Sequence, residues 1–148
     1  QMHDFDDWRR VIDVNLHSVF YVSCNVVSKM VNERTKGVII NISSISAAGN
    51  SGQSAYSAAK AGVNSLTATW AKELSPLGIR VVGVSPGYSN TNSTKTSLNE
   101  TIINRIKKEI PLKRLGHPQE IVEAILFGIK NDYMNGKVIE IDGGLIVS

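Results

Sequence analysis

A tyrosine followed four residues later by a lysine is the first candidate for chemistry in this sequence. Tyr56 and Lys60 have this spacing, and residues four apart share one face of a helix. An ammonium group beside a phenol favours the phenolate and lowers the tyrosine pKa from its reference value of about 10. Such a pair predicts an acid/base group that exchanges a proton near neutral pH. The alternative is a solvated helix face, and a second pair with this spacing, Tyr133 and Lys137, spans a turn-forming Asn-Gly dipeptide.

Two other polar side chains could assist a proton exchange. Ser43 is the first residue after the apolar run of residues 38–42 and opens a loop of small residues, so its hydroxyl could hydrogen-bond a substrate carbonyl. Asn15 interrupts an otherwise apolar helix face, where a carboxamide needs a hydrogen-bond partner. The alternatives are a serine that caps its own loop and an asparagine bonded to nearby backbone.

A proline and a glycine, Pro86 and Gly87, end a second apolar run, and residues 88–98 after them are rich in Ser, Thr and Asn. A glycine there permits close approach of the backbone to a ligand, although an ordinary turn is the alternative. The three histidines have neither Glu-x-x-His nor paired-His spacing, so we expect no metal site. No serine stands in a Gly-x-Ser-x-Gly elbow, which argues against a hydrolase.

The elements that must position these residues alternate between helices and short apolar strands. The predicted order is helix 6–32, strand 38–42, helix 53–75, strand 80–84, helix 98–110, helix 118–130 and strand 138–141. Buried strands that alternate with crossover helices indicate an α/β fold, a doubly wound parallel sheet with helices on both faces. Ligands of such sheets bind beyond the carboxyl ends of the strands, where Ser43 and Pro86 stand.

The composition limits the classes of partner. The 148 residues fit one domain, and 16 Lys and Arg against 13 Asp and Glu give a net charge of +3. No Lys/Arg run exceeds two residues, so a nucleic-acid or membrane-surface patch is not indicated. No apolar stretch reaches the roughly 20 residues of a membrane span. With the single cysteine, Cys24, and polar first residues, we expect a cytoplasmic protein.

Taken in order, these segments resemble the short-chain dehydrogenases/reductases over nearly the whole chain. Within that family the sequence is most similar to the bacterial 3-oxoacyl-acyl-carrier-protein reductases, as residues 49–53 and 110–116 suggest. Ser89 departs from the pattern, because relatives usually carry Ile after the aromatic residue of Pro-Gly-aromatic. The other matching segments are Val14-Asn15-Leu16, Asn41-Ile42-Ser43-Ser44, Tyr56 with Lys60, Pro86-Gly87 followed by Thr91, and Asp142-Gly143-Gly144.

The resemblance implies a hydride transfer between NAD(P)H and a ketone or secondary alcohol, most specifically reduction of 3-oxoacyl-ACP to 3-hydroxyacyl-ACP in fatty acid biosynthesis. Tyr56 would be the acid/base, and Lys60 would lower its pKa and bind the nicotinamide ribose. Ser43 would orient the carbonyl, and Asn15 would hold a water in a proton relay. Sugar, alcohol and steroid dehydrogenases of the family share most of the pattern, so they remain alternatives.

The same resemblance implies the cofactor and the assembly. NADP is favoured over NAD, and the residues implied to bind it are Tyr56, Lys60, Pro86, Gly87, Ser89 and Thr91. The substrate would be a small-molecule carbonyl or one carried by an acyl carrier protein. The two long helices and the last strand would form contacts in a homo-oligomer, a dimer or a tetramer.

One family element is missing from the sequence. None of the 12 glycines forms a Gly-x-x-x-Gly-x-Gly or Gly-x-Gly-x-x-Gly motif, which would approach the pyrophosphate. We therefore expect residues 1–148 to be the C-terminal, active-site half of a single NAD(P)-binding Rossmann-like domain that lacks its N-terminal βαβ segment. An unpaired strand at 38–42 would then need partner backbone beside it. The alternative is a truncated, non-catalytic family member that acts as an assembly partner.

Overall fold

The computed structural model describes residues 4–145, with the backbone alone at residues 93, 95 and 97. Gln1, Met2 and His3 lie outside the described residues. The strands are β1 (Gly37–Ile42), β2 (Ile79–Pro86) and β3 (Val138–Ile141). The helices are α1 (Phe5–Ile12), α2 (Ser18–Asn32), α3 (Ser54–Leu74), α4 (Asn92–Ser97), α5 (Glu100–Glu109) and α6 (Pro118–Lys130), with a π-helical turn η1 (Asp13–His17) and 3-10 turns η2 (Ile45–Ala48) and η3 (Ser75–Leu77).

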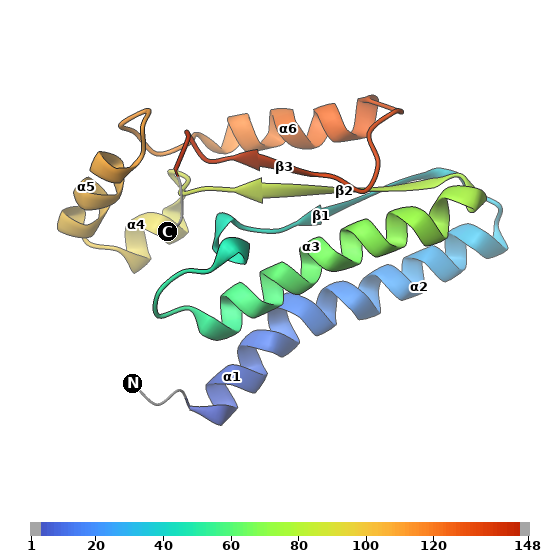
Figure 1. The fold of residues 1–148 in the computed structure, drawn as a ribbon, viewed down its shortest axis with the longest axis horizontal. Helices are drawn as coiled ribbons and strands as arrows, with labels where there is room; N and C mark the ends of the chain where they lie inside the picture. Colours follow the sequence, from blue (N-terminus) through green and yellow to red (C-terminus); the bar gives the residue numbers. More distant parts are fainter. Residues whose placement is uncertain (1–3, 146–148) are drawn as a thin grey trace.

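The three strands form one parallel sheet in the order β1-β2-β3, which confirms the predicted parallel arrangement. Asn41 of β1 is opposite Gly83 of β2, and Gly83 is opposite Val138 of β3. The central strand β2 is the most apolar part of the core, because Val81, Val82 and Val84 on it are fully buried. Helices α2 and α3 lie on one side of the sheet and α6 on the other, so both faces are covered as in a doubly wound fold (Figure 1).

The first long helix follows its predicted range but is less buried than its apolar pattern suggests. No residue of α1 or α2 is fully buried, and Val22 and Val26 are 63% and 47% exposed. In β1, likewise, only Asn41 is fully buried, although the sequence predicts a buried strand. The reason is the position of β1 at the sheet edge. Within residues 4–145 no strand pairs with its free side, so the expected partner backbone is not supplied by these residues.

The loop regions contain more helix than the sequence predicts. The Ser/Thr/Asn-rich stretch expected to be a loop holds α4, because Thr91 Oγ1 caps it by accepting the Thr94 N–H at 3.2 Å. Similarly, Ser44 Oγ accepts the Ser46 N–H at 3.2 Å and begins η2. The remaining predicted helices agree closely, and α6 begins at Pro118, where the missing N–H has no helical partner to lose. None of the helices among residues 4–145 has the combination of length and apolar character that crossing a bilayer requires.

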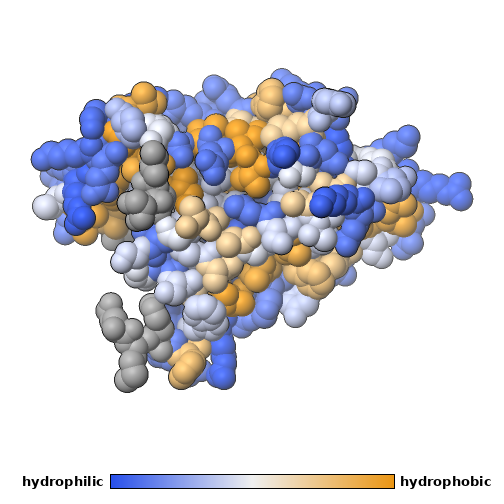
Figure 2. Space-filling view, viewed as in Figure 1, coloured by the Kyte–Doolittle hydropathy of each residue, from blue (hydrophilic) through white to orange (hydrophobic). Residues whose placement is uncertain are grey.

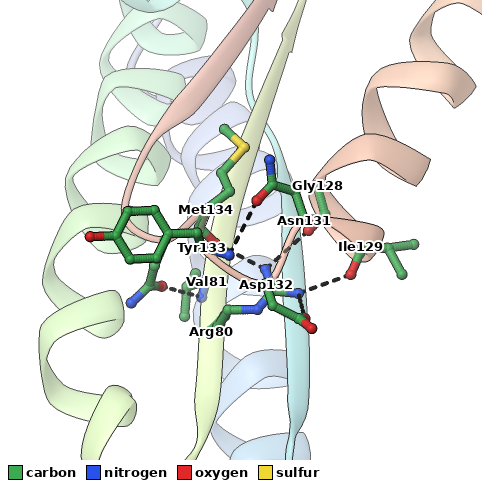
Figure 3. A network of polar contacts seen from close by, with 9 residues as sticks. Arg80, Val81, Gly128, Ile129, Asn131, Asp132, Tyr133 and Met134 are labelled. Carbon is green, nitrogen blue, oxygen red and sulfur yellow. Dashed lines mark hydrogen bonds and ion pairs between the residues drawn. The ribbon is translucent and has the colours of Figure 1, made fainter.

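The amino ends of the strands are held by an arginine. The Arg80 guanidinium, at the start of β2, donates to the carbonyl oxygens of Gly128 at 3.0 Å and Ile129 at 2.9 Å (Figure 3). It also donates to the Met134 carbonyl at 2.9 Å and to Asp132 Oδ1 at 3.3 Å. Arg80 thereby satisfies carbonyl groups at the end of α6, where helical donors run out, and ties the following loop to the sheet.

An asparagine completes this end of the fold. Asn135 Oδ1 accepts the N–H of the buried Val81 at 2.8 Å, and Gly136 N–H donates to the Val81 carbonyl at 2.8 Å. The Asn135 amide also donates to the Ala71 carbonyl at 3.2 Å and to Ser75 Oγ at 2.8 Å. The predicted Asn-Gly turn therefore joins β2 to the end of α3.

Candidate active site

The carboxyl ends of β1 and β2 and the start of α3 enclose a hollow of ≈ 630 Å³. Tyr56 lines it, and so do all four residues predicted to follow the strand at 80–84, which are Pro86, the last residue of β2, and Gly87, Ser89 and Thr91 after it. This position agrees with the rule that ligands of open parallel sheets bind beyond the carboxyl ends of the strands. The topology therefore brings the acid/base candidate of α3 together with the loop after β2.

Tyr56 and Lys60 lie one above the other on α3, as their spacing predicts. Lys60 Nζ is 5.6 Å from the centroid of the Tyr56 ring and donates to the Ile42 carbonyl at 3.1 Å. Burial lowers the pKa of Lys60 from its ordinary value, because removal from water disfavours the charged ammonium. An ammonium carries three donors, so two remain beyond the bond to Ile42. Lys60 does not line the hollow itself but a separate groove, of ≈ 530 Å³, between α2 and β1.

Ser43 does not face the hollow. Its side chain is buried, 3% exposed, and its Oγ donates to the Lys60 carbonyl at 3.3 Å. The next residue, Ser44, lines the hollow with Tyr56. Successive residues at a strand end point in opposite directions, so the hydroxyl that follows Ser43 is the one turned outward. Ser43 therefore bonds to the backbone of α3, whereas its sequence position predicts a hydroxyl that faces the ligand.

Asn15 lies in the π-helical turn η1, in which the Ser18 N–H bonds to the Asp13 carbonyl. The Asn15 amide nitrogen donates to the Val11 carbonyl at 3.0 Å. The alternative of an asparagine bonded to nearby backbone is thus what the structure shows for this nitrogen, and Asn15 does not line the hollow. Isolated π turns within α-helices are frequent at functional sites, and η1 packs against α3.

The loop after β2 is fixed by backbone contacts. Gly87 N–H donates to the Ile141 carbonyl at 2.8 Å, and a Cβ at Gly87 would lie 2.7 Å from Asp142 Cα. The close approach that requires this glycine is therefore to the end of β3. Ser89 Oγ donates to the Gly87 carbonyl at 3.4 Å, and Thr91 Oγ1 caps α4, so both hydroxyls have partners inside the loop.

Several residues that line the hollow carry no chemical signal in the sequence. Gln53 Oε1 accepts from Ser46 Oγ at 2.9 Å and closes one wall. Ile121 and Val122 form an apolar wall one turn into α6, a position that the helix-starting Pro118 could have indicated. Among the described residues no group of three or more His, Cys, Asp or Glu side chains could hold a metal ion.

These donors suit the ribose and nicotinamide end of a dinucleotide. The Lys60 ammonium has free donors for ribose hydroxyls and lies beside the Tyr56 ring at the edge of the groove between α2 and β1, while Tyr56, Pro86 and Gly87 line the hollow. The residues present therefore fit this end of the cofactor.

The chain is similar to known proteins over nearly its whole length. The family described as enoyl-(acyl carrier protein) reductase matches residues 2–146. The 3-oxoacyl-acyl-carrier-protein reductase FabG of Thermotoga maritima is 45% identical over 148 residues, which cover 96% of this chain and 58% of the relative. Human 3-hydroxyacyl-CoA dehydrogenase type-2 is 39% identical over 152 residues, covering 98% of this chain and 58% of the relative.

Solved structures of dehydrogenases are also similar to nearly the whole chain. The crystal structure of 3-hydroxyacyl-CoA dehydrogenase type-2 from Mycobacterium avium superposes with a TM-score of 0.92 and 34% identity, covering 100% of this chain and 60% of that one. A 4-hydroxyisoleucine dehydrogenase mutant complexed with NADH and succinate gives a TM-score of 0.91 and 33% identity, covering 98% and 61%. The chain thus spans about three fifths of the length of these relatives. On this evidence the chain belongs to the short-chain dehydrogenase/reductase family.

Proposed function

We propose that this chain is the active-site half of an NAD(P)-dependent oxidoreductase that interconverts 3-oxoacyl and 3-hydroxyacyl thioesters. The observation that carries the proposal is the stacking of Tyr56 and Lys60 on α3 beside the hollow at the strand ends. The names of the relatives add the substrate class. Both a 3-oxoacyl-acyl-carrier-protein reductase and 3-hydroxyacyl-CoA dehydrogenases act on an oxygen at carbon 3 of an acyl thioester.

In this mechanism the Tyr56 hydroxyl donates its proton to the carbonyl oxygen during reduction and takes it back in the reverse reaction. The Lys60 ammonium, beside the Tyr56 ring, favours the phenolate that forms and holds the ribose hydroxyls. The nicotinamide, when bound, supplies or accepts the hydride. Four residues that line the hollow would border the nicotinamide, namely Pro86, Gly87, Ser89 and Thr91. NADP remains favoured over NAD by resemblance alone.

A serine hydroxyl orients the carbonyl in this proposal, and the lining of the hollow favours Ser44 over Ser43. Ser44 Oγ accepts the Ser46 N–H, so its own proton can be donated to a substrate oxygen. Ser43 remains the prediction from the sequence, and its hydroxyl is engaged with the Lys60 carbonyl. Asn15 keeps its predicted role of holding a relay water, for which its side-chain oxygen is the available acceptor.

The rest of the domain is proposed to cover the groove between α2 and β1. Apolar side chains of α2 and β1 line the groove, and β1 offers a free edge beside it. A strand of the missing βαβ segment, which the chain's share of its relatives' length leaves unaccounted for, would pair with that edge. The proposal of a homo-oligomer draws support from other surfaces. Phe20 and Tyr21 of α2 and Phe127 of α6 are 43%, 61% and 52% exposed, and hydrophobic residues gather over both regions (Figure 2).

The test compares Tyr56→Phe with Tyr133→Phe in the complete domain, assayed by NAD(P)H oxidation with acetoacetyl-CoA. Tyr56→Phe should lower kcat by about 10²- to 10⁴-fold, because the proton donor is lost. Tyr133 is 100% exposed, so its variant serves as the matched control. Undiminished turnover by Tyr56→Phe would reject the mechanism. Absence of any turnover in the unmodified domain would favour the second candidate, a non-catalytic assembly partner that uses the exposed aromatic side chains of α2 and α6.

The two serines are separated by the same assay. Ser44→Ala should lower kcat by about 10- to 100-fold, since a donor to the developing oxyanion is removed. Ser43→Ala should act mainly on the free energy of unfolding, because the buried Ser43 hydroxyl donates to the Lys60 carbonyl. The reverse pattern would restore Ser43 as the group that orients the carbonyl.

A further inference from the structure

A second hollow, of ≈ 680 Å³, lies between α5 and the segment that leads into α6. One face of α5 forms a wall of it, since Glu100, Ile103, Asn104 and Lys107 recur at helical spacing and all line it. Leu98 lines both this hollow and the one that contains Tyr56. The two hollows are therefore neighbours that share a side chain, and an elongated ligand could occupy both.

The lining of this second hollow combines an apolar floor with a polar rim. Leu98 and Ile103 pack against the buried Leu115 and form the floor. The carboxamides on the rim belong to Asn90, Asn99 and Asn104. Such a surface suits a ligand that has both methylene groups and amide groups, because the amides on the rim can donate and accept hydrogen bonds.

The charges on the rim leave one cation without a partner. Arg114 is neutralised by Glu120, whose carboxylate oxygens it contacts at 2.6 and 2.8 Å. Lys107 is half-buried at the hollow and has no hydrogen bond or ion pair within the described residues. Glu100 is the one carboxylate among the residues that line the hollow, and His117 is the third basic side chain. Lys107 is therefore the group on this rim that would receive an anion.

We infer that this second hollow binds the phosphopantetheine arm of the substrate, with the Lys107 ammonium on its phosphate. The inference rests on the proposed function, because it takes the acyl thioester to react at Tyr56. Phosphopantetheine joins two amide groups and an aliphatic chain to a phosphate, which matches the carboxamide rim, the apolar floor and the free ammonium. Coenzyme A and an acyl carrier protein both present this arm, so either could be its source.

The decisive experiment measures KM for three acetoacetyl thioesters, those of coenzyme A, acyl carrier protein and N-acetylcysteamine, which lacks the phosphate. Lys107→Gln should raise KM about fivefold for the first two, leave KM for the third unchanged, and leave kcat unchanged for all three. Lys108→Gln is the matched control, since Lys108 is the exposed neighbour and does not line the hollow. Glu100→Gln should lower KM for the two phosphate-bearing thioesters, because a repelling charge is removed.

Each departure from this pattern overturns the inference in a distinct way. If Lys107→Gln raised KM equally for the N-acetylcysteamine thioester, Lys107 would not act on the phosphate. If KM rose only for the coenzyme A thioester, Lys107 would contact the nucleotide phosphates. If KM rose only for the carrier-protein thioester, Lys107 would contact the surface of the carrier protein. Calorimetric titration with 4′-phosphopantetheine and pantetheine needs no turnover. Tighter binding of the phosphorylated compound, lost in Lys107→Gln but kept in Lys108→Gln, is expected even if the proposed reaction fails, and equal binding of the two would reject the site.

Discussion

The two ends of the parallel sheet use their polar side chains differently. At the amino end, Arg80 and Asn135 donate to or accept from backbone groups of β2, α3, α6 and the loop before β3. At the carboxyl end, the side-chain bonds mostly join near neighbours in sequence, as where Thr91 Oγ1 accepts the Thr94 N–H, and backbone contacts such as Asn90 N–H to the Gly116 carbonyl at 2.8 Å link the loops to one another. The Tyr56 hydroxyl there makes no hydrogen bond within the described residues. Side chains at the amino end therefore tie separate elements together, whereas those at the carboxyl end bond locally and leave the Tyr56 hydroxyl available for a ligand.

This difference predicts that stability and chemistry can be altered separately. Substitutions at the amino end should change the free energy of unfolding, because they leave buried backbone groups without partners. Substitutions of the residues facing the hollow should change turnover with little effect on stability. The following variants test this separation, in order of decreasing effect.

Arg80→Met should have the largest effect and lower the free energy of unfolding by about 3 kcal/mol, since the carbonyl oxygens of Gly128, Ile129 and Met134 lose their donor. The Arg80 side chain is only 17% exposed, so water replaces the lost bonds poorly. Urea denaturation followed by circular dichroism measures the change. Arg105→Met is the matched control and should cost less than about 0.5 kcal/mol, because that side chain is 82% exposed. Equal losses in the two variants would contradict the proposed role of Arg80.

Asn135→Ala should have the next largest effect and lower the free energy of unfolding by about 2 kcal/mol, because it removes the acceptor of the buried Val81 N–H. The comparison at the carboxyl end is Asn99→Ala, which removes the N-cap of α5 and should cost about 1 kcal/mol. Thermal and urea unfolding of both variants measure the difference. A larger loss from Asn99→Ala would remove the distinction between the two ends.

Glu120 gives the smallest expected effect, and it depends on pH. Hydrogen bonds from Arg114 and from the His117 N–H lower the pKa of Glu120 from 4.5 to about 2. A folded-state pKa below the unfolded value gives a stabilisation that is present above about pH 4.5 and is lost as the pH falls toward 2. The Tm difference between the unmodified protein and Glu120→Gln should therefore shrink over that interval. A difference that stays constant with pH would show that the carboxylate charge is not its source.

The strand and helix ranges are largely predictable from the sequence, because periodicity reports local burial. The run 138–141 and the helix beginning at Pro118 are found where the pattern indicates. Burial of β1 and α2 is not predictable in the same way. Apolar residues show that a face of β1 or α2 can pack against another element. Whether another part of residues 4–145 covers that face depends on the order of the strands, and β1 lies at the sheet edge.

The site was predictable to the extent that it follows helical spacing. Tyr56 and Lys60 lie together because residues four apart on a helix must, whatever the tertiary structure. The direction of Ser43 was not predictable, because a shift of one residue at the end of a strand exchanges inward and outward side chains. The wall formed by Ile121 and Val122 comes from an element distant in sequence, so the helix start at Pro118 indicates their helix but not the hollow that they line.

The π-helical turn at Asp13–His17 accommodates one residue more than an α turn needs. Deleting one residue of this turn would restore a continuous α-helix and leave the flanking helices nearly in phase, because the wide turn has already absorbed the extra residue. A deletion within α1 itself, by contrast, would rotate the residues before it by about 100° around the helix axis and shift them by about 1.5 Å. The side of α1 that packs against α3 would then turn toward solvent. The π turn is therefore a place where the first helix tolerates a one-residue change in length with little loss of alignment.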